Sequence, residues 1–246
     1  MYKKILPALP LLCCLLFLSF KKEEKITVWM IGDSTMSVKQ EKAYPETGWG
    51  MAFATLFNAD VTVDNKAMNG RSTLSFINEK RWQEVYDGLK AGDYLIIEFG
   101  HNDEKITKPG TGTSLEAYKI NLARFVTEAR SKKAIPVLMT PIARRAFKEG
   151  KLEDTHKGYP GAVRSLADSL KVPMVDMLQK TSRLLEQYGE TKSTALFNYV
   201  DSGHVNYPKG SKDNTHLSPE GAAAIAGLAV EGLKELKLPL VKYLKR

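Results

Sequence analysis

The stretch VWMIGDSTM, residues 28–36, begins as a run of apolar residues and changes abruptly at Gly32 into a carboxylate and two hydroxyl side chains. A continuous apolar run is typical of a strand that is buried on both faces of a parallel sheet. Gly, Asp and Ser are common in turns, so the polar end is compatible with an ordinary turn. It is equally compatible with Ser34 as a nucleophile presented at the end of a strand.

Four further apolar runs follow along the chain, and helical patterns separate them. The five predicted strands are residues 26–31, 60–65, 93–99, 135–140 and 172–177. Among the helical patterns, residues 217–237 open with Ser218 and Pro219, which are typical of a helix N-cap and first position. Alternating strands and helices predict a single α/β domain, a three-layer α/β/α sandwich around a parallel sheet.

The composition is that of a soluble globular protein, with 43% hydrophobic and 26% charged residues. A length of 246 residues suits one α/β domain. The formal net charge of +8 would attract nucleic acid, anionic lipid or an acidic polysaccharide. No nucleic-acid-binding motif accompanies this charge, so we expect no nucleic acid partner.

The first twenty residues differ from the rest, because two lysines precede the apolar stretch ILPALPLLCCLLFLSF. This pattern predicts a signal peptide over residues 1–20, a single domain over 21–246, and a secreted or periplasmic protein with no stable membrane partner. No clear small-x-small cleavage site follows, so an uncleaved leader that anchors the chain stays an alternative. Cys13 and Cys14 both lie in this segment, which leaves the domain without a thiol nucleophile, a disulfide or a thiolate metal site.

Polar residues follow three consecutive predicted strands. Ser34 follows the first strand, Asn69-Gly70 the second, and GHND (100–103) the third. Ligands of parallel α/β sheets bind beyond the carboxyl ends of the strands, so these residues should meet at one rim. The N–H groups of Ser34 and Gly70 and the Asn102 amide could then stabilise an oxyanion. Asn-Gly is also an ordinary turn dipeptide and Asn102 could form an Asx turn, so neither residue establishes this role alone.

A base for Ser34 is offered by SKDNTHLSPEG, residues 211–221. Nucleophilic serine catalysis needs a group that accepts the hydroxyl proton and a second group that orients it. Asp213 and His216 are three residues apart, which is close enough for the carboxylate to orient the imidazole. The other imidazole nitrogen could then reach Ser34 across the rim. His101 and His204 have no acid at a suitable local spacing.

Four short motifs together resemble the conserved blocks of the SGNH (GDSL-type) hydrolase superfamily, over about residues 26–236. They are GDST (32–35), the Gly of NGRS (69–72), GHND (100–103) and DNTH (213–216). The resemblance implies a flavodoxin-like sheet of five parallel strands in the order 2-1-3-4-5, with no metal or organic cofactor. It also implies a role for each motif residue: Ser34 as nucleophile, Asp213 as orienting acid, His216 as base, and Ser34, Gly70 and Asn102 as the oxyanion hole.

The closest resemblance within this superfamily is to rhamnogalacturonan acetylesterases, carried by GDST in place of GDSL, TPIARRAF (140–147) and KDNTHLSPEGA (212–222). It implies an acetylated pectic polysaccharide or oligosaccharide as substrate. An acetylesterase for another glycan such as xylan, or an SGNH lipase or thioesterase, stays open. Arg71, Arg144 and Arg145 are the candidate substrate-binding residues, because guanidinium groups bind carboxylates. Solvated arginines are the competing interpretation.

Three other classes fit less well. A metallophosphoesterase is disfavoured by the order of residues in GHND and by a total of four histidines. An α/β-hydrolase needs a G-x-S-x-G elbow, and Met36 stands where its second Gly would be. A non-catalytic carbohydrate-binding module should have lost a member of the triad, and none is lost.

Overall fold

The computed structural model describes residues 25–245, so the predicted signal peptide over residues 1–20 lies outside the described residues. Five parallel strands form the central sheet in the order β2-β1-β3-β4-β7. Their bounds are β1 Ile26–Gly32, β2 Val61–Asn65, β3 Tyr94–Glu98, β4 Ile135–Met139 and β7 Met174–Val175. The predicted fold class and strand order are confirmed. The last strand is short because Pro173 has no N–H to donate before it and Asp176 caps the helix after it.

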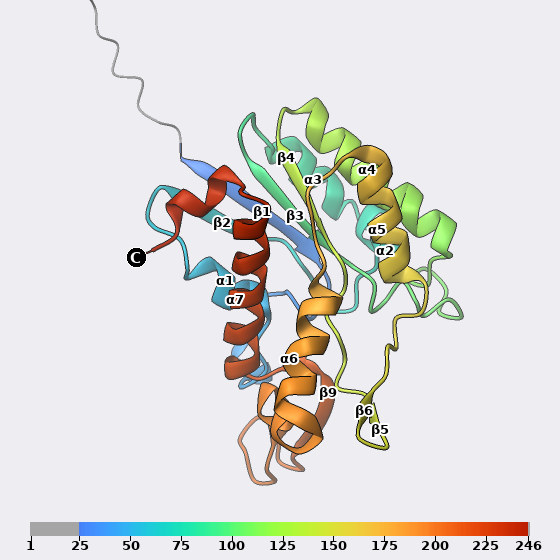
Figure 1. Cartoon of the computed structure of the whole chain (residues 1–246), viewed down its shortest axis with the longest axis vertical. Coiled ribbons are helices and arrows are strands. Elements are labelled where there is room, and N and C mark those ends of the chain that lie inside the picture. Colours follow the sequence, from blue (N-terminus) through green and yellow to red (C-terminus); the bar gives the residue numbers. More distant parts are fainter. Residues whose placement is uncertain (1–24, 246) are drawn as a thin grey trace, which may run out of the picture.

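Helices cover both faces of this sheet (Figure 1). One face carries α1 Trp49–Ala54, α6 Met177–Lys192 and α7 Pro219–Glu235; the other carries α2 Thr73–Asn78, α3 Arg81–Gly88, α4 Leu115–Ser131 and α5 Tyr159–Leu170. Alternate strand residues pack toward opposite faces. On β1, for example, Met30 belongs to the core under α1 and α7, and Ile31 to the core under α3 and α4.

Serine side chains cap α4 and α7, and the sequence pattern predicts the cap at Ser218. The side chain of Ser114 accepts a hydrogen bond from the Ala117 N–H at the start of α4. The side chain of Ser218 accepts one from the Gly221 N–H, and Pro219 takes the first position of α7. These caps satisfy N–H groups that have no partner within the helix.

Two small antiparallel hairpins lie outside the central sheet, and the sequence pattern did not reveal them. The first joins β5 Phe147–Lys148 to β6 Lys151–Leu152, between β4 and α5. The second joins β8 Phe197–Val200 to β9 Ser211–Leu217. Three short 3₁₀ helices, η1 Glu41–Ala43, η2 Ser193–Leu196 and η3 Pro239–Tyr243, complete the elements of the described residues. Within residues 25–245, no helix has the length and apolar character that crossing a membrane requires.

Candidate active site

The turn after β1 presents Ser34 at the rim of the sheet. A side chain on Gly32 would place its Cβ 2.5 Å from the Glu98 carbonyl oxygen, so β1 can end beside β3 only with a glycine here. The buried Asp33 carboxylate then accepts hydrogen bonds from the N–H and hydroxyl of Thr35, at 3.0 and 2.9 Å. Asp33 therefore organises the turn, and Ser34 is left at its surface with 8% exposure.

Ser34, His216 and Asp213 form one hydrogen-bonded chain. Ser34 Oγ lies 2.9 Å from His216 Nε2, and His216 Nδ1 lies 2.7 Å from Asp213 Oδ2. Strand β9 carries both Asp213 and His216. His216 follows Ser34 by 182 residues in the sequence. The other Asp213 oxygen accepts hydrogen bonds from the backbone N–H groups of Thr215 and His216, which fixes the carboxylate.

The Asp213 carboxylate is held in its ionised form. Partial burial raises its pKa, but the hydrogen bonds from the side chain and backbone of His216 outweigh burial and lower the pKa to about 2. An ionised Asp213 keeps a proton on Nδ1 of the imidazole. Nε2 is then free to accept the Ser34 proton, as a general base requires.

The three expected oxyanion donors lie on neighbouring, linked loops. The Ser37 hydroxyl donates to Asn69 Oδ1 at 2.6 Å, which joins the loop after β1 to the loop that carries Gly70. Gly70 has a left-handed φ of 78°, a conformation that glycine adopts readily. The Asn102 amide donates to the Arg71 carbonyl at 3.1 Å, which joins the third loop to the second.

Buried carboxyl groups lie beneath this rim. Glu98, at the end of β3, accepts a hydrogen bond from Trp49 Nε1 at 2.8 Å. Burial, together with the nearby Asp33 charge, raises the pKa of Glu98. Asp103 accepts from the N–H and hydroxyl of Thr73 at the start of α2, and burial raises its pKa to about 7. These groups support the loops from below.

Sequence reasoning missed a second cluster behind the GHND loop. His156 Nδ1 lies 2.9 Å from Glu104 Oε2, and His156 Nε2 lies 2.8 Å from the Ile142 carbonyl oxygen. Arg144 forms an ion pair with the same Glu104. The only local signal for His156 is Asp154, whose carboxylate accepts from the His156 N–H. Nothing in the sequence pattern links it to Glu104, 52 residues away.

The three candidate substrate-binding arginines have different surroundings. Arg144 is engaged by Glu104, as described above, and its side chain is 18% exposed. Arg145 donates to Asn214 Oδ1 at 2.9 Å and to Ser193 Oγ at 3.1 Å, so it braces β9. Arg71 pairs with Glu79 at 3.0 Å, and its side chain is 31% exposed directly after Gly70. Of the three, Arg71 is the one that directly follows Gly70 in the sequence.

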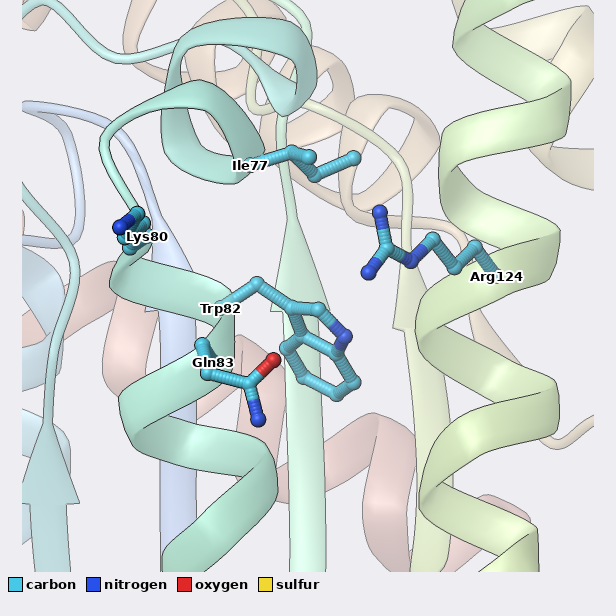
Figure 2. A pocket seen from close by; sticks show the side chains of 5 residues that line it. All are labelled: Ile77, Lys80, Trp82, Gln83 and Arg124. Atoms are coloured by element: carbon cyan, nitrogen blue, oxygen red, sulfur yellow. The ribbon is translucent and has the colours of Figure 1, made fainter.

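A separate hollow of about 400 Å³ lies between the ends of α2 and α3 and the side of α4 (Figure 2). Its lining residues are Ile77, Lys80, Trp82, Gln83 and Arg124. None of them belongs to the Ser34–His216–Asp213 chain or to the expected oxyanion donors, and it contains no acid–base pair.

Comparison with known families agrees with this geometry. The model of the GDSL-like lipase/acylhydrolase family matches residues 30–224, a segment that begins within β1 and ends within α7. The chain belongs to this family. The matched segment includes all four motifs at the rim.

Two relatives and one solved structure are similar over most of the chain. The rhamnogalacturonan acetylesterase RhgT of Bacillus subtilis is 43% identical over 226 residues, which cover 90% of this chain and 95% of RhgT. The probable rhamnogalacturonan acetylesterase YesY of the same organism is 31% identical over 216 residues, covering 87% and 95% of the two chains. The crystal structure of a catalytic mutant of Axe2, an acetylxylan esterase from Geobacillus stearothermophilus, shares the fold with a TM-score of 0.61 at 18% identity, covering 85% of this chain and 94% of that one.

Proposed function

We propose that this protein is a serine esterase that removes O-acetyl groups from a plant cell-wall polysaccharide, rhamnogalacturonan. The hydrogen-bonded chain from Asp213 through His216 to Ser34 carries the proposal, because it supplies a nucleophile, a base and an orienting acid in one line. The similarity to RhgT and YesY supports the substrate class. The predicted signal peptide is in keeping with a polymeric substrate outside the cell.

The first half of the proposed reaction acylates the enzyme. Ser34 Oγ attacks the acetyl carbonyl carbon while His216 Nε2 accepts the hydroxyl proton. The carbonyl oxygen becomes an oxyanion, which accepts hydrogen bonds from the N–H groups of Ser34 and Gly70 and from the Asn102 amide. The intermediate then collapses, His216 gives its proton to the departing sugar oxygen, and the acetyl group stays on Ser34.

The second half regenerates the serine. His216 removes a proton from water, and the resulting hydroxide attacks the acetyl-serine carbonyl. Collapse of the second tetrahedral intermediate releases acetate and returns the proton from His216 to Ser34. The partial exposure of His216, whose side chain is 29% accessible, gives water a route to its imidazole.

The central test compares acetate release from acetylated rhamnogalacturonan and from acetylated xylan, with the wild type beside Ser34→Ala. We expect release from rhamnogalacturonan by the wild type and none by the variant. Equal release from both polymers would indicate that the protein is a general carbohydrate acetylesterase. Release from neither would direct the search to lipid and thioester substrates, and activity that survives in Ser34→Ala would overturn the nucleophile.

Arg71 is the proposed contact for the carboxylate of an acidic sugar, and the chain supplies a matched control. Arg71 and Arg81 each place Nε beside Glu79 Oε2, at 3.0 and 2.7 Å, and both side chains are 31% exposed. Only Arg71 adjoins Gly70. In Arg71→Gln, KM for acetylated rhamnogalacturonan should rise about three- to tenfold more than KM for p-nitrophenyl acetate, since one partly exposed ion pair is lost. The same ratio in Arg81→Gln should stay at the wild-type value, and equal ratios in the two variants would exclude Arg71 as a substrate contact.

A further inference from the structure

Lys39 is a buried lysine directly behind the candidate nucleophile. The residue is 4% exposed, and a buried ammonium group is stable only when its charge and its N–H groups find partners. Its Nζ lies 2.7 Å from Glu46 Oε1 and donates to Asn69 Oδ1 at 2.8 Å and to the Ser34 carbonyl oxygen. Two hydrogen-bond acceptors and one carboxylate therefore surround the ammonium group.

Two of these acceptors lie on or directly beside residues of the expected oxyanion hole. The Ser34 carbonyl lies on the residue whose own N–H is one expected donor, and Asn69 directly precedes Gly70, whose N–H is another. The Ser37 hydroxyl contacts the same pair of acceptors, at 3.3 and 2.6 Å. Lys39 therefore bridges the loop after β1 and the loop after β2 from inside the protein.

We propose that Lys39 is a positioning residue for the oxyanion hole, and this inference rests on the proposed function. Its ammonium group holds the Ser34 peptide and the Asn69 side chain, so that the N–H groups of Ser34 and Gly70 are fixed toward one oxygen atom. Its buried positive charge also favours the negative charge that develops on that oxygen.

The pKa of Lys39 is lowered on balance, and its acidic neighbours limit this shift. Burial lowers its pKa, and the Glu46 carboxylate opposes this through its hydrogen bond and its charge. The negative charges of Asp33 and Asp213 act in the same direction as Glu46. Lys39 therefore interacts with Asp213, the acid of the candidate triad, through charge alone. It contacts Ser34, the candidate nucleophile, directly through a hydrogen bond to the carbonyl oxygen.

The test compares Lys39→Met with Lys66→Met. Lys66 directly follows β2, on the segment that leads to Asn69 and Gly70. Its side chain is 31% exposed and pairs with Glu84 at 2.8 Å. Lys66 is therefore a lysine close to Gly70 in the sequence that does not make the contact of Lys39 with Ser34. We measure kcat and KM on p-nitrophenyl acetate, and the rate and final extent of Ser34 labelling by a fluorophosphonate. In Lys39→Met, kcat should fall roughly tenfold to hundredfold, because misplaced donors cost somewhat less than a removed donor.

The remaining readouts separate positioning from loss of structure. KM of Lys39→Met should change by less than about threefold, and labelling should be slower yet reach one fluorophosphonate per chain, since the oxyanion hole acts on the transition state. Lys66→Met should match the wild type. A smaller fall in kcat, or a fall that equals the unlabelled fraction of chains, would overturn the proposal.

A second variant covers the case in which Lys39→Met does not fold. Asn69→Ala removes one acceptor of the ammonium group at an exposed residue. It should lower kcat at least threefold with little change in KM, and a smaller fall would overturn the proposal. A wild-type enzyme that is not labelled at Ser34 would instead contradict the proposed function, which keeps the two failures distinct.

Discussion

The two halves of the candidate triad are built in different ways. Ser34 follows β1, in the interior of the central sheet, and is 8% exposed. His216 and Asp213 lie on β9, in a two-stranded hairpin outside that sheet, with side chains 29% and 31% exposed. The nucleophile half is therefore part of the core of the domain, and the base half belongs to its surface.

The supports of the two halves differ accordingly. The nucleophile half is held from within by buried charged groups, Lys39 and Asp33. The base half is held from the side by Arg145, whose backbone N–H and guanidinium both donate to Asn214, between Asp213 and His216. The nucleophile and the oxyanion donors require fixed positions, because small displacements weaken transition-state hydrogen bonds. In the proposed reaction the base requires access to water and to the leaving sugar, which an exposed hairpin allows.

The largest expected effect tests whether the two halves act as one unit. His216→Ala and Ser34→Ala should each lower kcat by about ten-thousandfold or more, and the double variant should be no worse than either, because neither group works without the other. Turnover of p-nitrophenyl acetate and far-ultraviolet circular dichroism of the three variants provide the check. A His216→Ala enzyme with a hundredth of wild-type activity would show that the base half is dispensable.

A smaller effect is expected from loosening the base half alone. Arg145→Gln should lower kcat roughly three- to tenfold, because the substitution displaces β9. The decrease should be the same on p-nitrophenyl acetate and on acetylated rhamnogalacturonan, because no contact with the substrate is lost. Arg164 provides the control, because it lies on α5, at the opposite face of the sheet from α7, and pairs with Asp176. Arg164→Gln should keep the wild-type kcat. A rise in KM confined to the acidic polymer would instead return Arg145 to the role of substrate contact.

A further prediction concerns pH and the carboxyl groups of the two halves. Burial raises the pKa of Asp103, on the nucleophile side, to about 7, whereas hydrogen bonds lower the pKa of Asp213. Between about pH 4 and 7 the native state therefore binds more protons at Asp103 than the unfolded state does, so this group's contribution to the free energy of unfolding falls as pH rises. Asp103→Asn has no such proton to lose.

Urea unfolding of the wild type and Asp103→Asn from pH 4 to 8 measures this contribution. The free energy of unfolding of the wild type, relative to that of the variant, should decline with increasing pH through this range. A constant difference across the range would show that the Asp103 carboxyl does not change its protonation there.

Much of the fold could be predicted because its signals are local. A continuous apolar run such as residues 93–99 indicates a buried strand wherever it occurs, and Ser218 with Pro219 indicates a helix start. The hairpin of β8 and β9 could not be predicted in this way. Its strand over Ser211–Leu217 is largely polar, and it pairs with a partner whose sequence carries no complementary pattern.

For the candidate site, the sequence by itself determined the chemistry available at the rim: a serine after the first strand, a glycine and an asparagine after the next two, and an acid and imidazole three residues apart. The tertiary structure alone decided which groups meet. It placed His216 Nε2 2.9 Å from Ser34 Oγ and buried Lys39 between Ser34, Asn69 and Glu46. It also committed Arg144 and Arg145 to protein acceptors. Local patterns record which backbone conformation a residue favours, but a contact between distant segments depends on how the whole sheet and its helices pack.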